Sequence, residues 1–190
     1  MLFRSDLRQE LASIALMKTW PLPGATILRG LILWPAISVT VMTWGFAALA
    51  LVFTGLAGSR EPGPMTLAGA AAFFLVSPGI IFTEYTAHNG VAVLFPAWVP
   101  VGPSRGRGVD AAGQRLILLL ANWLGLALAL APGAGVTTAL WFGLPGLRPW
   151  TLPVGAAVTT LMVGAELWVL TGLLGRAFER LDETDAERGE

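Results

Sequence analysis

Residues 30–59 read GLILWPAISVTVMTWGFAALALVFTGLAGS, thirty residues in succession without Asp, Glu, Lys or Arg. Three further runs are similar: residues 62–83, 116–147 and 149–175, the last interrupted by Glu166 alone. A helix needs about 20 apolar residues to cross the hydrocarbon core of a bilayer. The sequence therefore predicts an all-α polytopic membrane protein with four transmembrane helices.

The composition of the whole chain of 190 residues favours the same fold class. Hydrophobic residues make up 55% and charged residues 13%, whereas ordinary soluble domains carry roughly 25% charged residues. The chain has no Cys, a single His and a single Lys, Lys18, which no Gly-x-x-x-x-Gly segment precedes. These absences exclude thiolate and multi-histidine metal centres and a P-loop, so we expect no enzyme activity, no metal and no cofactor in this chain.

The basic residues are distributed unevenly along the chain. Ten of the twelve fall before the first run, between the second and third, or after the fourth, and the other two are Arg60 and Arg148. Cytoplasmic loops of membrane proteins are enriched in Lys and Arg. We therefore predict that both termini are cytoplasmic and that the chain lies in the inner, cytoplasmic membrane of the cell. Twelve acidic residues balance the basic ones, so no nucleic-acid partner is expected.

The predicted organisation has three parts. A cytoplasmic amphipathic or coupling-type segment covers residues 1–26, a transmembrane domain covers 27–176, and an acidic cytoplasmic tail covers 177–190. The four spans are placed near residues 28–54, 64–84, 115–132 and 152–175, with a cytoplasmic loop over 85–114.

The third uncharged run is too long for a single span and contains helix-breaking residues. Pro132 and Gly133 interrupt it, and the apolar piece from Gly135 to Leu144 is only ten residues long. Ten residues cannot cross about 30 Å of hydrocarbon. We therefore expect a re-entrant hairpin or an interfacial segment over residues 133–150, before the last span.

The first residues of the chain form an amphipathic pattern. Phe3, Leu7, Leu11 and Ile14 recur at spacings of four, four and three, which places them on one face of a helix. Such a helix either lies in the inner headgroup layer or docks a cytoplasmic partner.

Residues 16–23, LMKTWPLP, followed by ILRG at 27–30, resemble a recurring stretch in the permease subunits of type-2 ATP-binding-cassette exporters. In that family an amphipathic helix ends near a basic residue and a Leu-Pro-type turn, and a long transmembrane helix follows. FRSDLR at 3–8, LFPAW at 94–98 and LGRAFER at 174–180 are similar to a bacterial branch of such exporters. The chain resembles the C-terminal portion of the family unit, without its two N-terminal spans.

The resemblance implies a function and a set of partners. The chain would be the membrane-spanning permease component of an ATP-driven exporter, with ATP hydrolysed by a separate cassette ATPase subunit. Its other partners would be the lipid bilayer and either a second permease unit or the missing N-terminal half. The residues matching the ATPase-docking stretch are Arg8, Leu11, Leu16, Lys18, Trp20 and Pro21.

Glu166 is the only ionisable residue deep inside a predicted span, where a carboxylate costs about 2.5–3.5 kcal/mol. We expect it to face other helices or water, either as a substrate-contact, coupling or proton-relay residue or as a protonated or hydrogen-bonded group that holds helices together. Pro35 and Pro78 are candidate hinges. Two alternative functions remain open: a small proton-coupled four-helix transporter using Glu166, and a non-transporting membrane scaffold.

Overall fold

The computed structural model describes residues 16–17, 19–57, 63–95 and 109–180. Within those ranges the chain forms four long helices and no strand. They are α3 (Gly24–Ala57), α4 (Pro64–Leu94), α5 (Val109–Gly143) and α6 (Arg148–Arg180), and a 3-10 turn, η3 (Pro145–Leu147), joins α5 to α6. The predicted all-α architecture with four membrane-spanning helices is thereby confirmed. The predicted docking residues Arg8, Leu11 and Lys18, and most of the acidic tail, lie outside the described residues.

All four helices are long and apolar enough to cross a bilayer, which places the chain in a membrane. At 1.5 Å per residue, helices of this length extend for about 45–50 Å, more than the roughly 30 Å of hydrocarbon that they have to cross. Their ends therefore project beyond the apolar layer. Each helix also contains an internal proline without ending there: Pro35, Pro78, Pro132 and Pro153.

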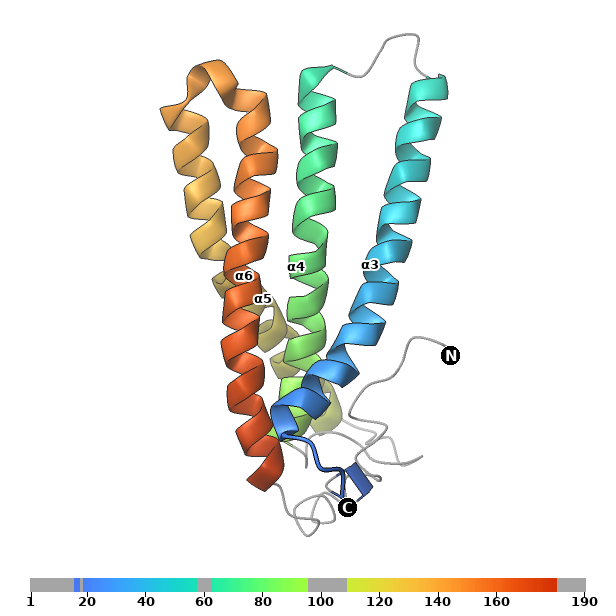
Figure 1. Ribbon diagram of the computed structural model, residues 1–190, viewed down its shortest axis with the longest axis vertical. Coiled ribbons are helices and arrows are strands. Elements are labelled where there is room, and N and C mark those ends of the chain that lie inside the picture. The colour runs from blue at the N-terminus through green and yellow to red at the C-terminus, as the bar shows by residue number, and fades with distance from the viewer. Residues whose placement is uncertain (1–15, 18, 58–62, 96–108, 181–190) are drawn as a thin grey trace.

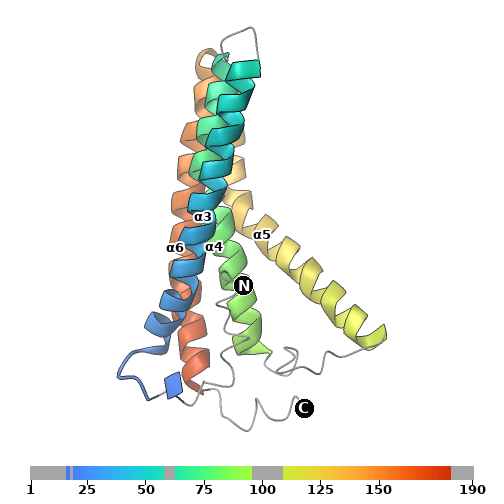
Figure 2. The same cartoon turned by 90° about the vertical axis from the view of Figure 1, so that its right-hand side faces the viewer.

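The helices alternate in direction and form a bundle with α4 between α6 and α3 (Figure 1). We call the end where α3 begins and α6 ends the base of the bundle, and the opposite end the top. The two described chain ends meet at the base, where the backbone N–H of Gly24 donates a hydrogen bond to Glu179 Oε1 at 2.8 Å. Figure 2 shows the first half of α5 diverging from the other three helices as it approaches the base.

The path of α5 corrects the expectation of a re-entrant or interfacial segment over residues 133–150. α5 passes through Pro132 to Gly143, and α6 begins at Arg148. The reason is a close contact that the sequence does not reveal. A Cβ atom on Gly133 would overlap the Thr159 side chain, so the lack of a side chain lets α5 pack directly on α6. This packing outweighs the hydrogen bond lost at Pro132.

The predicted loop over residues 85–114 is also shorter than expected, because α4 continues to Leu94 and α5 begins at Val109. Glu84 and His88 therefore lie on one continuous helix, and both are exposed. Among the described residues no group of three acidic, His or Cys side chains could hold a metal ion.

The buried core lies at the base. It consists of apolar side chains from α3, α4, α6 and the segment before α3: Met17, Ile27, Leu28, Ala92, Val93, Leu174 and Phe178. Elsewhere many large apolar side chains point outward, and Trp34 and Leu161 are 72% and 74% exposed. Lipid is the solvent in which such a surface is stable, because no apolar area is then left in water.

Candidate functional site

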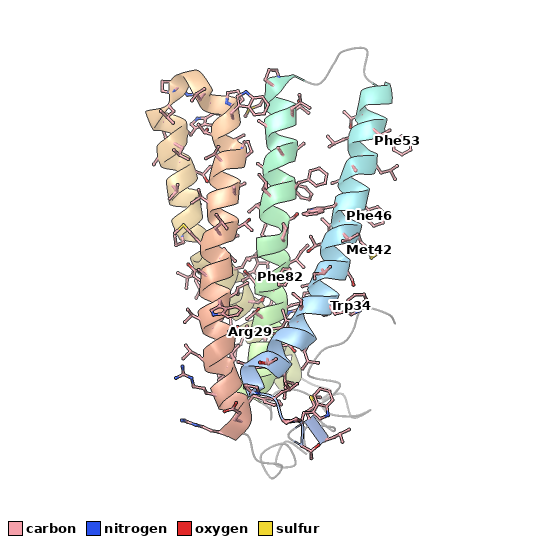
Figure 3. All side chains as sticks on the ribbon, in the orientation of Figure 1. Arg29, Trp34, Met42, Phe46, Phe53 and Phe82 are labelled. Atoms are coloured by element: carbon pink, nitrogen blue, oxygen red, sulfur yellow. The ribbon has the colours of Figure 1, made fainter. Side chains whose placement is uncertain are left out.

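A cavity of about 480 Å³ lies between α3, α4 and α6 in the half of the bundle nearer the base. Its volume falls in the range of roughly 300–1,000 Å³ that is typical of small-molecule sites. Most of the lining is apolar, and among the residues that the structure describes Arg29 is the one charged side chain in it. Figure 3 shows Arg29 and Phe82 on the same side of the bundle, in the space between α6 and α3. The cavity is therefore an apolar chamber with a single fixed cation.

The Arg29 guanidinium is fixed by three contacts with α6. Its Nε–H donates to Thr171 Oγ1 at 3.1 Å, and its Nη2 donates to the backbone carbonyl of Trp168 at 3.0 Å. Its Cζ lies 3.5 Å from the centroid of the Trp168 ring, a cation–π contact. The guanidinium thus spans the gap between α3 and α6, and its plane is held against an indole.

The local sequence of α6 makes this contact geometry possible. Thr171 donates its own hydroxyl proton to the carbonyl of Leu167 at 2.8 Å, which leaves the lone pairs of Oγ1 to accept from Arg29. Gly172 follows, and a Cβ atom there would lie 3.9 Å from Arg29 Nη2. The absence of a side chain at Gly172 therefore leaves open space beside the guanidinium.

The floor of the cavity is the part of α4 around the predicted hinge at Pro78. Thr160 of α6 donates its hydroxyl to the carbonyl of Leu75 at 2.6 Å, and Trp44 of α3 donates its indole N–H to Ser77 Oγ at 3.0 Å. A proline removes one backbone donor and loosens the helix near it. Hydrogen bonds from side chains of α3 and α6 therefore reach α4 close to Pro78, where the backbone hydrogen bonds of α4 are interrupted.

The other candidate hinge, Pro35, is buried within α3. The helix remains continuous through it, and Figure 1 shows α3 bending in its lower part. Arg29 lies on the base side of Pro35, and most of the helix lies on the other. A change of bend at Pro35 would move Arg29 relative to α6.

Glu166 lies outside the lining of the cavity, and its expected orientation toward other helices or water stays a prediction. The residue is exposed. It continues the α6 face that carries Gly155 and Thr159, the residues in closest contact with α5. The first half of α5, which would otherwise continue along this face toward the base, diverges from α6 (Figure 2).

Three of the predicted docking residues are described by the structure, and they lie at the base, in the turn before α3. Leu16 and Trp20 are 64% and 51% exposed, and Pro21 is exposed as well. Met17 between them is buried in the core at 4% exposure. One side of this turn is therefore fastened to the bundle, and the other is open to a partner.

No family model, no curated protein and no solved structure matches this chain. Sequence reasoning did not find its central contact, between Arg29 and the pair Trp168 and Thr171. Arg29 counted only as a basic residue at the edge of the first span, and its partners are 139 and 142 residues away along the chain. The signal available was a lone Arg one turn inside a long apolar helix.

Proposed function

We propose that the chain is the membrane-spanning permease component of an ATP-driven exporter, energised by a separate cassette ATPase. The observation that carries the proposal is the attachment of the turn before α3. Met17 packs into a core built from α3, α4 and α6, and the Gly24 N–H bonds to Glu179. A displacement of this turn would pass to three transmembrane helices at once, which is what an external ATPase needs in order to drive a permease.

The exposed side of the same turn supplies a docking surface. Leu16, Trp20 and Leu22 are 64%, 51% and 49% exposed, and large apolar side chains of this kind act as anchors at protein interfaces. In the proposed orientation the base faces the cytoplasm of a bacterial cell, because basic residues gather there. The ATPase would bind from that side.

The cavity lies within reach of the same movement. Arg29 is five residues beyond Gly24 on α3, so a push on the base would shift Arg29 against Trp168 and Thr171 of α6. Such a shift would open or close the side of the cavity between α3 and α6, with Pro35 as the hinge. The remaining part of the pathway would come from a second permease unit or from an N-terminal half.

The two alternatives have less support. A proton-coupled transporter would use a carboxyl that its substrate competes with, but Glu166 lies outside the cavity. A non-transporting scaffold leaves the cavity and its single cation without a role. Only the exporter requires ATP, so the dependence of transport on ATP distinguishes it from both alternatives.

The test is co-expression of the chain with a cassette ATPase whose gene adjoins its own. We expect the two to co-purify, with loss of the complex on Leu16→Asp and retention on Leu147→Asp. Leu147 is a matched control because it is an exposed Leu, 56% accessible, at the opposite end of the bundle. Equal effects of both substitutions would contradict docking at the base. Flux through the chain alone, driven by a proton gradient and abolished by Glu166→Gln, would replace the exporter by the proton-coupled alternative.

A further inference from the structure

We propose that the cavity between α3, α4 and α6 binds a single-chain anionic amphiphile drawn from the bilayer, with its acidic head group at Arg29 and its hydrocarbon chain along Phe82 and Val163. Binding follows from the geometry of the cavity alone. That the bound amphiphile is also the exported substrate rests on the proposed function. The two statements are tested separately below.

The charge of Arg29 favours an anionic ligand. Its hydrogen-bond partners within the described chain, a hydroxyl and a carbonyl, are neutral. None of the described acidic side chains lines the cavity. A cation in apolar surroundings is costly unless it is paired. A carboxylate or phosphate head group would supply the missing negative charge.

The second argument is donor geometry. A guanidinium has five N–H donors, of which one on Nε and one on Nη2 are used within the described residues. The three remaining donors lie in a plane that the Trp168 ring holds fixed. Planar donors fixed in this way suit the two oxygens of a carboxylate or phosphate. A Lys side chain would supply the positive charge but not the planar arrangement of N–H donors.

The third argument is the direction of access. Leu33 of α3 and Trp168 of α6 belong to the lining and are 51% and 66% exposed. Both lie on the outer surface of transmembrane helices, which the bilayer surrounds. The cavity thus opens sideways toward lipid, so its natural ligand is one that partitions into the membrane.

The fourth argument is the shape and chemistry of the interior. Phe82 and Val163 line it, and Val163 is fully buried. Gly164 also belongs to the lining, and a Cβ atom added there would have no atom within 4 Å. The interior therefore offers an apolar trough with open space beside it, and burial of a hydrocarbon chain in such a trough is favourable by about 0.8 kcal/mol per methylene.

The test uses the full chain without any ATPase, purified in an uncharged detergent. Native mass spectrometry would measure the binding of palmitate, lysophosphatidylglycerol, lysophosphatidylcholine and hexadecanol. We expect palmitate or lysophosphatidylglycerol to bind at least tenfold more tightly than hexadecanol. The stronger of the two identifies the head group as a carboxylate or a lipid phosphate. Lysophosphatidylcholine should bind weakly, because its choline cation faces the guanidinium. Binding of hexadecanol as tight as that of both palmitate and lysophosphatidylglycerol would overturn the proposal.

Two pairs of variants locate the bound molecule. Arg29→Gln should weaken binding of the anionic probe at least tenfold, whereas Arg176→Gln, an exposed Arg near the same end, should not. Gly164→Leu should abolish binding by filling the trough, whereas Gly125→Leu should not, since Gly125 also has open space around it but lies on α5, outside the cavity. Equal losses within either pair would place the amphiphile elsewhere and overturn the proposal.

These experiments distinguish a failure of amphiphile binding from a failure of the exporter function. Head-group-selective binding by the isolated chain confirms the site even if no ATPase ever associates with it. Conversely, an ATPase complex whose chain binds all four probes equally would leave the exporter standing and refute this ligand class. ATP-dependent release of the anionic probe from the complex would identify the bound amphiphile as the transported substrate.

Discussion

α6 crosses a neighbouring helix closely at each end of the bundle, and the two crossings differ. At the base, Gly24 of α3 meets Gly175 of α6, and a Cβ atom on Gly24 would lie 2.5 Å from the Gly175 carbonyl oxygen. At the top, Gly133 and Gly155 meet the side chains of Thr159 and Thr137. The base crossing thus joins backbone to backbone, whereas the top crossing joins backbone to a side chain. At the base crossing the backbone can hardly move to accommodate an added side chain, whereas at the top crossing the threonine side chains can rotate.

The two crossings also explain what lies between them. Away from the base, α3 moves away from α6 and leaves the cavity with Arg29. Away from the top, α5 diverges from α6 (Figure 2), and Glu166 on α6 is exposed. Helices approach closely where small residues allow it, and space opens where larger residues follow. The position of the candidate site is therefore set by glycines on either side of the cavity along the helices, outside the cavity itself.

The largest effect should come from the base crossing. Gly175→Ala should lower the free energy of unfolding by about 3 kcal/mol, since the new methyl group would overlap the backbone of Ala25. The measurement is equilibrium unfolding of the protein in mixed detergent micelles. Gly30→Ala is the matched control, because a Cβ atom there meets nothing within 4 Å, and it should be neutral or stabilising. Equal stability of both variants would contradict the close approach of α3 and α6.

A smaller effect is expected at the top crossing. Gly133→Ala should cost about 2 kcal/mol, because the Thr159 side chain can rotate to relieve part of the overlap. Gly135→Ala, two residues away on α5 with nothing within 4 Å, should instead stabilise the helix by up to about 1 kcal/mol. Thermal melting of both variants in detergent measures the difference. A Gly133 variant as stable as the Gly135 variant would show that α5 does not pack on α6 here.

The smallest effect concerns the polar contact at the base. Glu179→Gln should destabilise the protein by about 0.5–1 kcal/mol, because a neutral amide oxygen accepts the Gly24 N–H less strongly and no longer offsets the helix dipole. Glu84→Gln, on an exposed site of α4, should change stability far less. The stability of both variants is measured by thermal melting in detergent at low salt. An equal change in the two variants would show that the hydrogen bond between Gly24 and Glu179 does not stabilise the base.

The number of membrane-spanning helices could be predicted from the sequence, because it follows from the lengths of the uncharged runs. Charge-free runs predict the four spans because a bilayer demands a minimum apolar length. The path through Pro132 was not predictable, because it depends on Thr159 packing against Gly133. The end of α4 was missed for a related reason, since Ala92 and Val93 pack in the core at the base and support the helix beyond residue 84.

The candidate site was less accessible to sequence reasoning. The predicted turn around Leu16 and Trp20 does carry exposed apolar side chains, but its role as an ATPase contact stays a prediction. Glu166 stands out in the sequence because it interrupts an apolar run, yet within the described residues it lies outside the cavity and is exposed. The charged residue of the candidate site is Arg29. Its position depends on Trp168 and Thr171, and no local pattern relates residues so far apart along the chain.

The inclination of α5 makes the molecule responsive to the thickness of its membrane. Its apolar window, Leu116–Gly143, contains 28 residues, which extend for about 42 Å against roughly 30 Å of hydrocarbon. A helix with such an excess fits by tilting, and the tilt decreases as the acyl chains of the surrounding lipids lengthen. Longer lipids would bring the lower half of α5 upright against α6 and cover the carboxyl of Glu166, whereas shorter ones would spread the bundle and widen its footprint in the plane of the bilayer.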